Sequence, residues 1–390
     1  MAPMMTGPNR KKLDILESAT RVFSEKGFAD ATLSEIAKGA GLTSSGIYLY
    51  YKNKEALLFT IIEKFLIESS AGLKEHLQGI DGVENKLRKA IWFHCKSYTG
   101  NKNEIKIVLE SRSYPRFYQS TAYNALKQYS GIITDIIIEG MQDGTFSGVS
   151  SPMILRDMIL GTVDHIAINW TLKDEPNSLD QAEKIYDLVM RAVQPVRKET
   201  LPLDKKAEKS LKIVNSAIAL FTEKGFNDTS MLEIAKNADV AEGTVYEYFR
   251  NKEDLMISIP REKLTRLYDS VSGKSLETRI KKIISSIFEF YYDEKEYSTI
   301  LVLMLRTNKK FHQSASNEII EKLFKIIEEI IARGQAENIF RRDIDLDICR
   351  NLLFGTLDHI MIPWIIFNRR YDLRLLGSEV SDLFVKAIRA

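Results

Sequence analysis

The sequence predicts an all-α protein built from two similar units in tandem. Apolar residues recur every three or four positions, as at Leu13, Leu16 and Phe23, and the same spacing returns from Leu211 onward. This spacing places apolar side chains on one face of a helix. Alternating segments bounded by hairpin turns, which would indicate strands, are absent. A chain of 390 residues also exceeds one ordinary core and favours two or three domains.

An internal repeat defines the domain organisation. Shifting the sequence by 198 positions aligns residues 13–57 with residues 211–255 without a gap, and 21 of these 45 positions are identical. Later the offset falls to 194, where Gly161-Thr-Val-Asp-His165 matches Gly355-Thr-Leu-Asp-His359. Such a repeat indicates a duplicated unit. We expect a first headpiece of short helices at 1–66, a first helical body at 67–195, a linker at 196–204, a second headpiece at 205–263 and a second body at 264–390.

The composition excludes several classes of protein. Hydrophobic residues make up 44% and charged residues 28% of the chain, which is typical of a globular protein. The net charge is only +2, so any surface for nucleic acid must be local. Cys95 and Cys349 form no metal-binding or disulfide pattern, and neither a secretory signal nor a membrane-spanning run is visible. We therefore expect a cytoplasmic protein without membrane contact, metal or other cofactor.

Signals for helix starts and ends place short helices near the beginning of each copy. Gly27 and Gly225 are expected to end the first helix. The motifs Thr32-x-x-Glu35 and Ser230-x-x-Glu233 are capping boxes that open a second, short helix. A tight turn then leads to a third helix, expected over 44–51 in copy one and 242–249 in copy two. This order is that of a helix-turn-helix, whose second short helix enters the major groove of DNA.

The two motifs resemble a known family. LSEIAKGAGLTSSGIYLYYKNKEALL and LEIAKNADVAEGTVYEYFRNKEDLM are similar to the helix-turn-helix signature of the TetR family of bacterial transcriptional repressors. Residues 305–373 resemble the regulatory half of the TetR subgroup that controls fatty-acid metabolism and responds to acyl-CoA. Together the resemblances cover nearly the whole chain, as two fused units in place of one. Copy one departs from the signature with Ser45-Gly46 in place of Gly-Thr, and copy two has Ala241 in place of the capping hydroxyl.

The resemblance implies which residues lie on the DNA side of each headpiece. These residues are mostly small, hydroxylated or aromatic, and each copy adds a lysine. In copy one they are Thr32, Thr43, Ser44, Ser45, Gly46, Tyr48, Tyr50 and Lys54. In copy two they are Ser230, Glu242, Gly243, Thr244, Tyr246, Tyr248 and Lys252.

Charge and sequence differences between the headpieces predict asymmetric DNA binding. Residues 10–64 carry nine basic and seven acidic residues, whereas residues 205–264 carry ten of each. Copy one is therefore expected to bind the phosphate backbone more strongly. Because SSGIYLY differs from EGTVYEY, the preferred operator is expected to be an imperfect inverted repeat, with half-sites about 34 to 36 Å apart. The alternative is a sensing or protein-interaction module in which the second headpiece no longer binds DNA.

The bodies offer candidate residues for a small-molecule effector, with an acyl-CoA or fatty acid implied by the resemblance. The polar and aromatic residues that recur in both copies are Arg112, His165, Trp170, Arg306, His359 and Trp364. The arginines can meet an acidic ligand group or form salt bridges. The histidines are favoured as hydrogen-bonded residues between paired helices, because no second ligand stands at metal spacing, and the tryptophans as core or interface residues.

The sequence does not decide between two oligomeric states, and it argues against an enzyme. The two bodies can pair within one chain as a pseudo-dimer, or two chains can form a homodimer with four headpieces. Phosphate-binding loops, dinucleotide-binding glycine motifs and hydrolase or metalloprotease signatures are absent. We therefore expect a DNA-binding regulator that is released by its effector, and not an enzyme.

Overall fold

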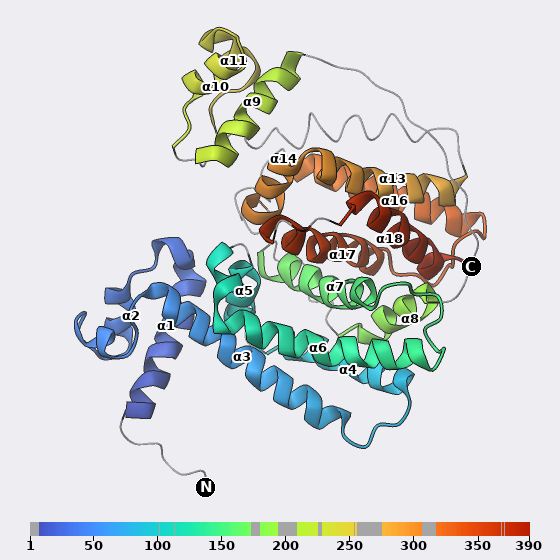
Figure 1. Cartoon of the computed structure of the whole chain (residues 1–390), viewed down its shortest axis with the longest axis horizontal. Helices are drawn as coiled ribbons and strands as arrows, with labels where there is room; N and C mark the ends of the chain where they lie inside the picture. The colour runs from blue at the N-terminus through green and yellow to red at the C-terminus, as the bar shows by residue number, and fades with distance from the viewer. Residues whose placement is uncertain are drawn as a thin grey trace. The chain divides into compact units, whose positions relative to one another are not determined.

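The structure, a computed structural model, is helical throughout the part of the chain that it describes (Figure 1). The described residues are 8–100, 102–112, 114–172, 180–193, 209–224, 228–252, 254–255, 275–305, 317–367, 369 and 371–390. Within them the extended backbone pairs only at an isolated bridge between Phe340 and Arg389. The predicted all-α fold is confirmed. Within the same ranges, no helix has both the length and the apolar character needed to cross a membrane.

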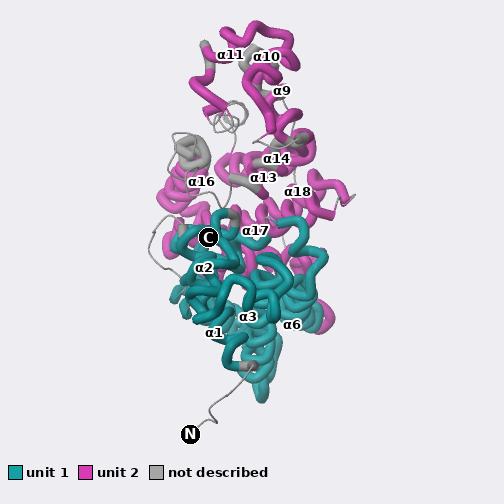
Figure 2. The backbone as a smooth tube through the Cα atoms, turned by 90° about the vertical axis from the view of Figure 1, so that its left-hand side faces the viewer, with its two compact units in different colours: residues 1–140, 166–182 teal, residues 141–165, 183–390 magenta. Residues whose placement is uncertain are grey.

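The chain divides into two compact units (Figure 2). Unit 1 comprises Met1–Gly140 and Ile166–Ala182, and unit 2 comprises Met141–His165 and Glu183–Ala390. The division does not follow the sequence repeat, because unit 2 holds all of copy two together with two segments of copy one. Residues from the two copies therefore meet inside unit 2.

Copy one contains eight α-helices and two 3₁₀ helices among its described residues. They are α1 (Pro8–Asp30), α2 (Leu33–Gly39), η1 (Gly46–Leu49), α3 (Lys54–Leu77), α4 (Val83–Tyr98), α5 (Lys102–Ser111), η2 (Pro115–Gln119), α6 (Thr121–Gln142), α7 (Pro152–Leu172) and α8 (Ala182–Ala192). The expected end of the first helix at Gly27 appears as a kink. Gly27 has a φ of 79°, and helical backbone resumes beyond it as far as Asp30. Gly225 lies outside the described residues.

The described part of copy two repeats this order. Its helices are α9 (Lys209–Lys224), α10 (Met231–Asn237), α11 (Glu242–Tyr248), α13 (Leu276–Asp293), α14 (Lys295–Ile300), the π-helix η3 (Leu301–Leu305), α16 (Asn317–Ala336), α17 (Leu346–Ile366) and α18 (Leu373–Ile388). The linker expected at 196–204 lies outside the described residues.

A π-helix accounts for one difference in length between the copies. Val83 and Leu276, which open α4 and α13, stand 193 positions apart, whereas Arg112 and Arg306 stand 194 apart. Copy two thus carries one extra residue between these points. The π-helix η3 lies in this interval, and π turns are the usual way for a helix to absorb a single inserted residue.

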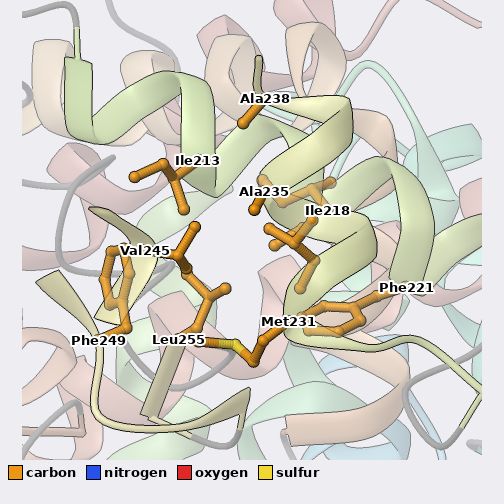
Figure 3. Close-up of a cluster of buried hydrophobic side chains, with 11 residues drawn as sticks. Ile213, Ile218, Phe221, Met231, Ala235, Ala238, Val245, Phe249 and Leu255 are labelled. Carbon is orange, nitrogen blue, oxygen red and sulfur yellow. The ribbon is translucent and has the colours of Figure 1, made fainter. Parts of the chain in front are cut away.

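Each headpiece has its own small apolar core. In copy two the core joins residues of α9, α10 and α11 with Phe249 and Leu255, as Figure 3 shows. In copy one the matching positions are fully or almost fully buried: Ile15, Phe23, Ile36, Ile47 and Leu57. Burial of such side chains contributes about 1.5–3 kcal/mol each, so both headpieces possess the core that a three-helix unit needs.

The turn between the second and third helices has a left-handed backbone in both copies, but only copy one places a glycine there. Gly41 has a φ of 67°, and the residue at the matching position in copy two, Asp239, has a φ of 55°. We predict that Gly41→Ala destabilises headpiece one by about 1 kcal/mol through backbone strain alone, because a Cβ built there meets no atom within 4 Å. Asp239→Gly should stabilise headpiece two.

Amide hydrogen exchange of α2 and α10 measures both effects, with about fivefold faster exchange expected in α2 of the Gly41→Ala variant. Gly131→Ala is the matched control, because Gly131 lies within α6 and its added Cβ also meets no atom within 4 Å. This control should leave α2 exchange unchanged. Equal exchange in the Gly41→Ala variant and the wild type would contradict the assignment of strain to Gly41.

Candidate DNA interface and regulatory core

The third helix of headpiece one is shorter and tighter than expected. The sequence predicted a helix over 44–51, but the structure has the 3₁₀ helix η1 only from Gly46 to Leu49. The backbone N–H of Gly46 donates to the Thr43 carbonyl at 3.0 Å, and Tyr48 N–H donates to the Ser45 carbonyl at 3.3 Å. These bonds span three residues, which is the 3₁₀ pattern.

This short helix has one buried and one exposed side. Ile47 is fully buried, whereas Tyr48 and Leu49 are 59% and 86% exposed. The hydroxyl residues Thr43, Ser44 and Ser45 are also exposed, and Gly46 and Tyr50 are half-buried. The Oγ atoms of Ser34 and Ser44 lie 2.7 Å apart, linking α2 to the segment before η1.

The third helix of headpiece two is a regular α-helix. Its N-cap, Ala241, makes no side-chain cap, as the missing hydroxyl implies. Tyr246 is 49% exposed. Glu242 and Gly243 are exposed and Thr244 is half-buried, while the side chain of Tyr248 lies outside the described residues.

Both predicted capping boxes are present. Thr32 Oγ1 accepts from Glu35 N–H at 3.3 Å, and Ser230 Oγ accepts from Glu233 N–H at the same distance. In each box the backbone N–H of the cap residue donates in turn to the glutamate carboxylate. Glu35 also pairs with Lys26, and this hydrogen bond is the largest cause that lowers the pKa of its carboxyl. The hydroxyls of Thr32 and Ser230 therefore hold the start of α2 and α10.

Two lysines predicted on the DNA side brace the headpieces internally. Lys54 Nζ donates to the Ala31 carbonyl at 2.9 Å, and Lys252 Nζ donates to the Thr229 carbonyl at 2.7 Å. Lys54 also lies over the Phe28 ring, 4.6 Å from its centroid. This brace was not predicted, although the same lysine at the same place in both copies was an available signal.

Helix α5 joins headpiece one to the body of unit 1. Ser24 Oγ donates to Asn103 Oδ1 at 2.7 Å, and Lys106 Nζ donates to the Ser24 carbonyl at 2.8 Å. The rings of Phe28 and Tyr114 meet edge to face at 5.2 Å. In copy two, α9 likewise packs against α14, the helix that corresponds to α5. A change in the position of α5 or α14 would therefore reach the attached headpiece directly.

Of the predicted effector residues, Arg112 is buried and the two tryptophans each contact a lysine. Arg112 is 7% exposed, at the end of α5. Lys102 Nζ lies 5.2 Å from the ring centroid of Trp170, and Lys295 Nζ lies 5.0 Å from that of Trp364. The same lysine–tryptophan contact thus ties the end of α7 to α5 and the end of α17 to α14.

The indole N–H of Trp364 is a buried donor in this region. Trp364 is only 4% exposed, yet its buried indole Nε1 has no acceptor among the described residues. A buried N–H without an acceptor costs about 1–3 kcal/mol, which a bound ligand could offset. Arg306 lies outside the described residues.

Inside unit 2, α7 of copy one crosses α17 of copy two at two glycines. A Cβ built on Gly161 would lie 2.1 Å from the Gly355 carbonyl oxygen, and one built on Gly355 would lie 2.0 Å from that of Gly161. The two backbones therefore touch at the crossing, and only glycine permits this approach.

Both predicted histidines lie beside this crossing. His165 Nδ1 donates to Asn351 Oδ1 at 2.8 Å, and His359 Nε2 donates to Asp164 Oδ2 at 2.6 Å. Asp157 Oδ1 lies 3.9 Å from His359 Nδ1. Asp157 and Asn351 occupy matching positions in the repeat, so the two sides of the crossing are related but chemically different.

Further bonds connect the two copies around the crossing. Lys184 pairs with Asp345 at 2.9 Å, and Arg341 pairs with Asp187 at 2.5 Å. Ser150 Oγ donates to the carboxylate of Glu379.

The described residues contain no group of three or more His, Cys, Asp or Glu side chains arranged to hold a metal ion. Burial raises the pKa of the Cys95 thiol to about 12 and raises that of Cys349 as well.

Two family models match the chain, each of them twice. The model of bacterial regulatory proteins of the tetR family matches residues 15–61 and 213–259. The model of the C-terminal region of YsiA-like proteins, TetR_C_4, matches residues 63–192 and 249–387. The chain belongs to the TetR family. Both matches occur once in each copy, so the predicted tandem of two TetR units is confirmed.

Individual relatives match from about half to most of this TetR-family chain. It is 28% identical over 191 residues to the fatty acid metabolism regulator protein of Bacillus subtilis (strain 168), covering 48% of this chain and 98% of that protein. It is 18% identical over 338 residues to the uncharacterized HTH-type transcriptional regulator YxbF of the same organism, covering 85% and 86%. The structure of FadR from Bacillus subtilis in complex with stearoyl-CoA is 29% identical, with a TM-score of 0.42, covering 46% of this chain and 100% of that one.

A buried carboxyl on α5 makes the stability of unit 1 depend on pH. Burial raises the pKa of Glu110 to about 7, despite Lys106 at 3.9 Å. The folded state then binds more protons than the unfolded state between the usual pKa of 4.5 and about 7. Stability therefore falls as pH rises through this range. We predict that Glu110→Gln stabilises unit 1 at pH 8 by about 1–3 kcal/mol more than at pH 5.

Thermal unfolding at the two pH values measures this difference. Glu75→Gln, at an exposed position of α3, is the control and should change the melting temperature equally at both. An equal effect of Glu110→Gln at pH 5 and pH 8 would show that the Glu110 carboxyl does not carry the pH dependence.

Proposed function

We propose that this protein is a single-chain, ligand-responsive repressor that reads an imperfect inverted repeat in the major groove. The observation that carries the proposal is the α7–α17 crossing at Gly161 and Gly355, where copy one and copy two pair inside one chain. Further hydrogen bonds and ion pairs between the copies surround the crossing. Paired bodies supply two headpieces, and docking of the second becomes intramolecular once the first is bound.

Several observations support a DNA-binding role for both headpieces. Each has a buried core, a complete capping box and a lysine brace. Tyr48 and Tyr246, at matching positions, are both exposed. We infer that these tyrosines and the exposed small residues beside them face the bases and phosphates. Ala241 lacks a capping hydroxyl, yet α11 is helical, so the loss of about 1 kcal/mol from a missing cap does not prevent its formation.

We infer that the effector is an acyl-CoA or fatty acid that acts through α5 and α14. The inference draws on the name of the fatty acid metabolism regulator, which matches this chain at 28% identity. Arg112 offers a buried cation for an acidic group, and Trp364 offers an N–H donor. Because α5 is bonded to headpiece one, a ligand that displaces α5 would alter the spacing of the headpieces and weaken DNA binding.

Selection from random DNA followed by footprinting tests the DNA-binding part of the proposal. The expected site is an imperfect inverted repeat that one chain protects. Tyr48→Phe and Tyr246→Phe should each weaken binding about fivefold, because each removes one hydroxyl hydrogen bond. If Tyr48→Phe weakens DNA binding but Tyr246→Phe leaves the affinity unchanged, the alternative in which the second headpiece does not bind DNA is favoured. Selection of a perfect palindrome would contradict asymmetric reading.

Addition of a long-chain acyl-CoA tests the regulatory part. We expect a higher melting temperature and release of the selected DNA, with free coenzyme A as the control. The absence of a melting shift with every acyl-CoA and fatty acid tried would overturn this effector class while leaving the DNA-binding result intact.

A further inference from the structure

Leu49 is an exposed apolar residue at the end of η1 in headpiece one. Its side chain is 86% exposed, and it closes η1 beside Tyr48, which is 59% exposed. Ile47 already supplies the buried apolar contact of this helix. Leu49 therefore adds little to the stability of the headpiece, and its exposed side chain is available to a partner.

The surroundings of Leu49 favour DNA over a protein as that partner. Thr43, Ser44 and Ser45 are exposed on the same segment, and Lys52 follows closely in sequence and is exposed. A protein-binding surface usually needs a contiguous apolar patch, whereas a single apolar side chain among hydroxyls and a cation matches the floor of the major groove. There the apolar group that a base presents is the C5 methyl of thymine.

Copy two carries a chemically opposite residue at the matching position of the sequence. The gap-free alignment pairs Leu49 with Glu247. A glutamate carboxylate accepts a hydrogen bond from the N4 amino group of cytosine, and it gains nothing from a methyl group. In the major groove, thymine presents a C5 methyl group, whereas cytosine presents an N4 amino group. The difference between leucine and glutamate at this position can therefore distinguish the two half-sites.

We propose that Leu49 is a specificity-determining residue that contacts a thymine methyl group in one half-site, while the corresponding base of the other half-site is cytosine. The proposal rests on the proposed DNA-binding function. It specifies how the two half-sites differ: the base pair at this position is T·A opposite headpiece one and C·G opposite headpiece two.

Deoxyuridine substitution provides the test, because it removes only the methyl group. In the duplex selected from random DNA, each thymine is replaced in turn by deoxyuridine, and the affinities of the full-length protein and the Leu49→Ala variant are measured. The wild type should lose about fourfold at one thymine, the value of one buried methyl group. The Leu49→Ala variant should bind the thymine and deoxyuridine duplexes equally.

Leu375→Ala is the matched control, because Leu375 is 73% exposed but lies on α18 of the body. It should keep the wild-type response to deoxyuridine. A second variant, Leu49→Glu, copies headpiece two and should change the base selected at that position from thymine to cytosine, which makes the selected repeat more symmetric.

The outcomes separate this proposal from the function on which it rests. If selection enriches no sequence, the proposed function fails and the assignment of Leu49 fails with it. If a site is enriched but contains no thymine whose methyl group matters, or if Leu49→Ala keeps the deoxyuridine response, the assignment of Leu49 is overturned alone.

Discussion

The contact between Gly161 and Gly355 is the constraint on which the account of this protein depends. With no side chain at either position, the backbones of α7 and α17 touch, and this close approach brings His165 and His359 within hydrogen-bonding distance of the opposite helix. Any Cβ at the crossing would have to displace a backbone carbonyl, an overpacking that typically costs 1–3 kcal/mol. The crossing thus unites the two copies in unit 2, and the proposal of a single-chain regulator rests on it.

At matching positions of the two copies, some contacts between helices are shared and some residues differ. The capping boxes, the lysine braces and the lysine–tryptophan contacts occur in both copies, since each stabilises a joint between helices. Other pairs differ: Asp157 matches Asn351, and Leu49 matches Glu247. The first pair lies at the crossing and makes its two sides unequal, and the second lies in the headpieces. These two differences therefore lie at the crossing and in the headpieces, while the joints between helices named above are the same in both copies.

Sequence reasoning predicted the features that depend on local pattern. The repeat, the helical class and the capping boxes follow from spacing and from residues a few positions apart, and all are present. The 3₁₀ form of η1 was missed, because it differs from an α-helix only in backbone bonds that reach three residues back, such as that from Tyr48 N–H to the Ser45 carbonyl. The lysine braces were missed although Lys54 and Lys252 stand at matching positions. The partners of His165 and His359 were not predictable, because they depend on which distant helices meet. The assignment of residues to DNA and effector contact, taken from the resemblance, stays a prediction.

The most direct test of the central claim is the number of chains in solution and on DNA, measured by sedimentation velocity and by native mass spectrometry. The α7–α17 crossing predicts one 44.6 kDa chain in the free protein and one chain on each selected duplex. A Gly161→Leu variant should lose this compact single-chain state. Two chains with four headpieces on one duplex, formed by the wild type at concentrations near its DNA affinity, would contradict the claim that the two copies complete one regulator within a single chain.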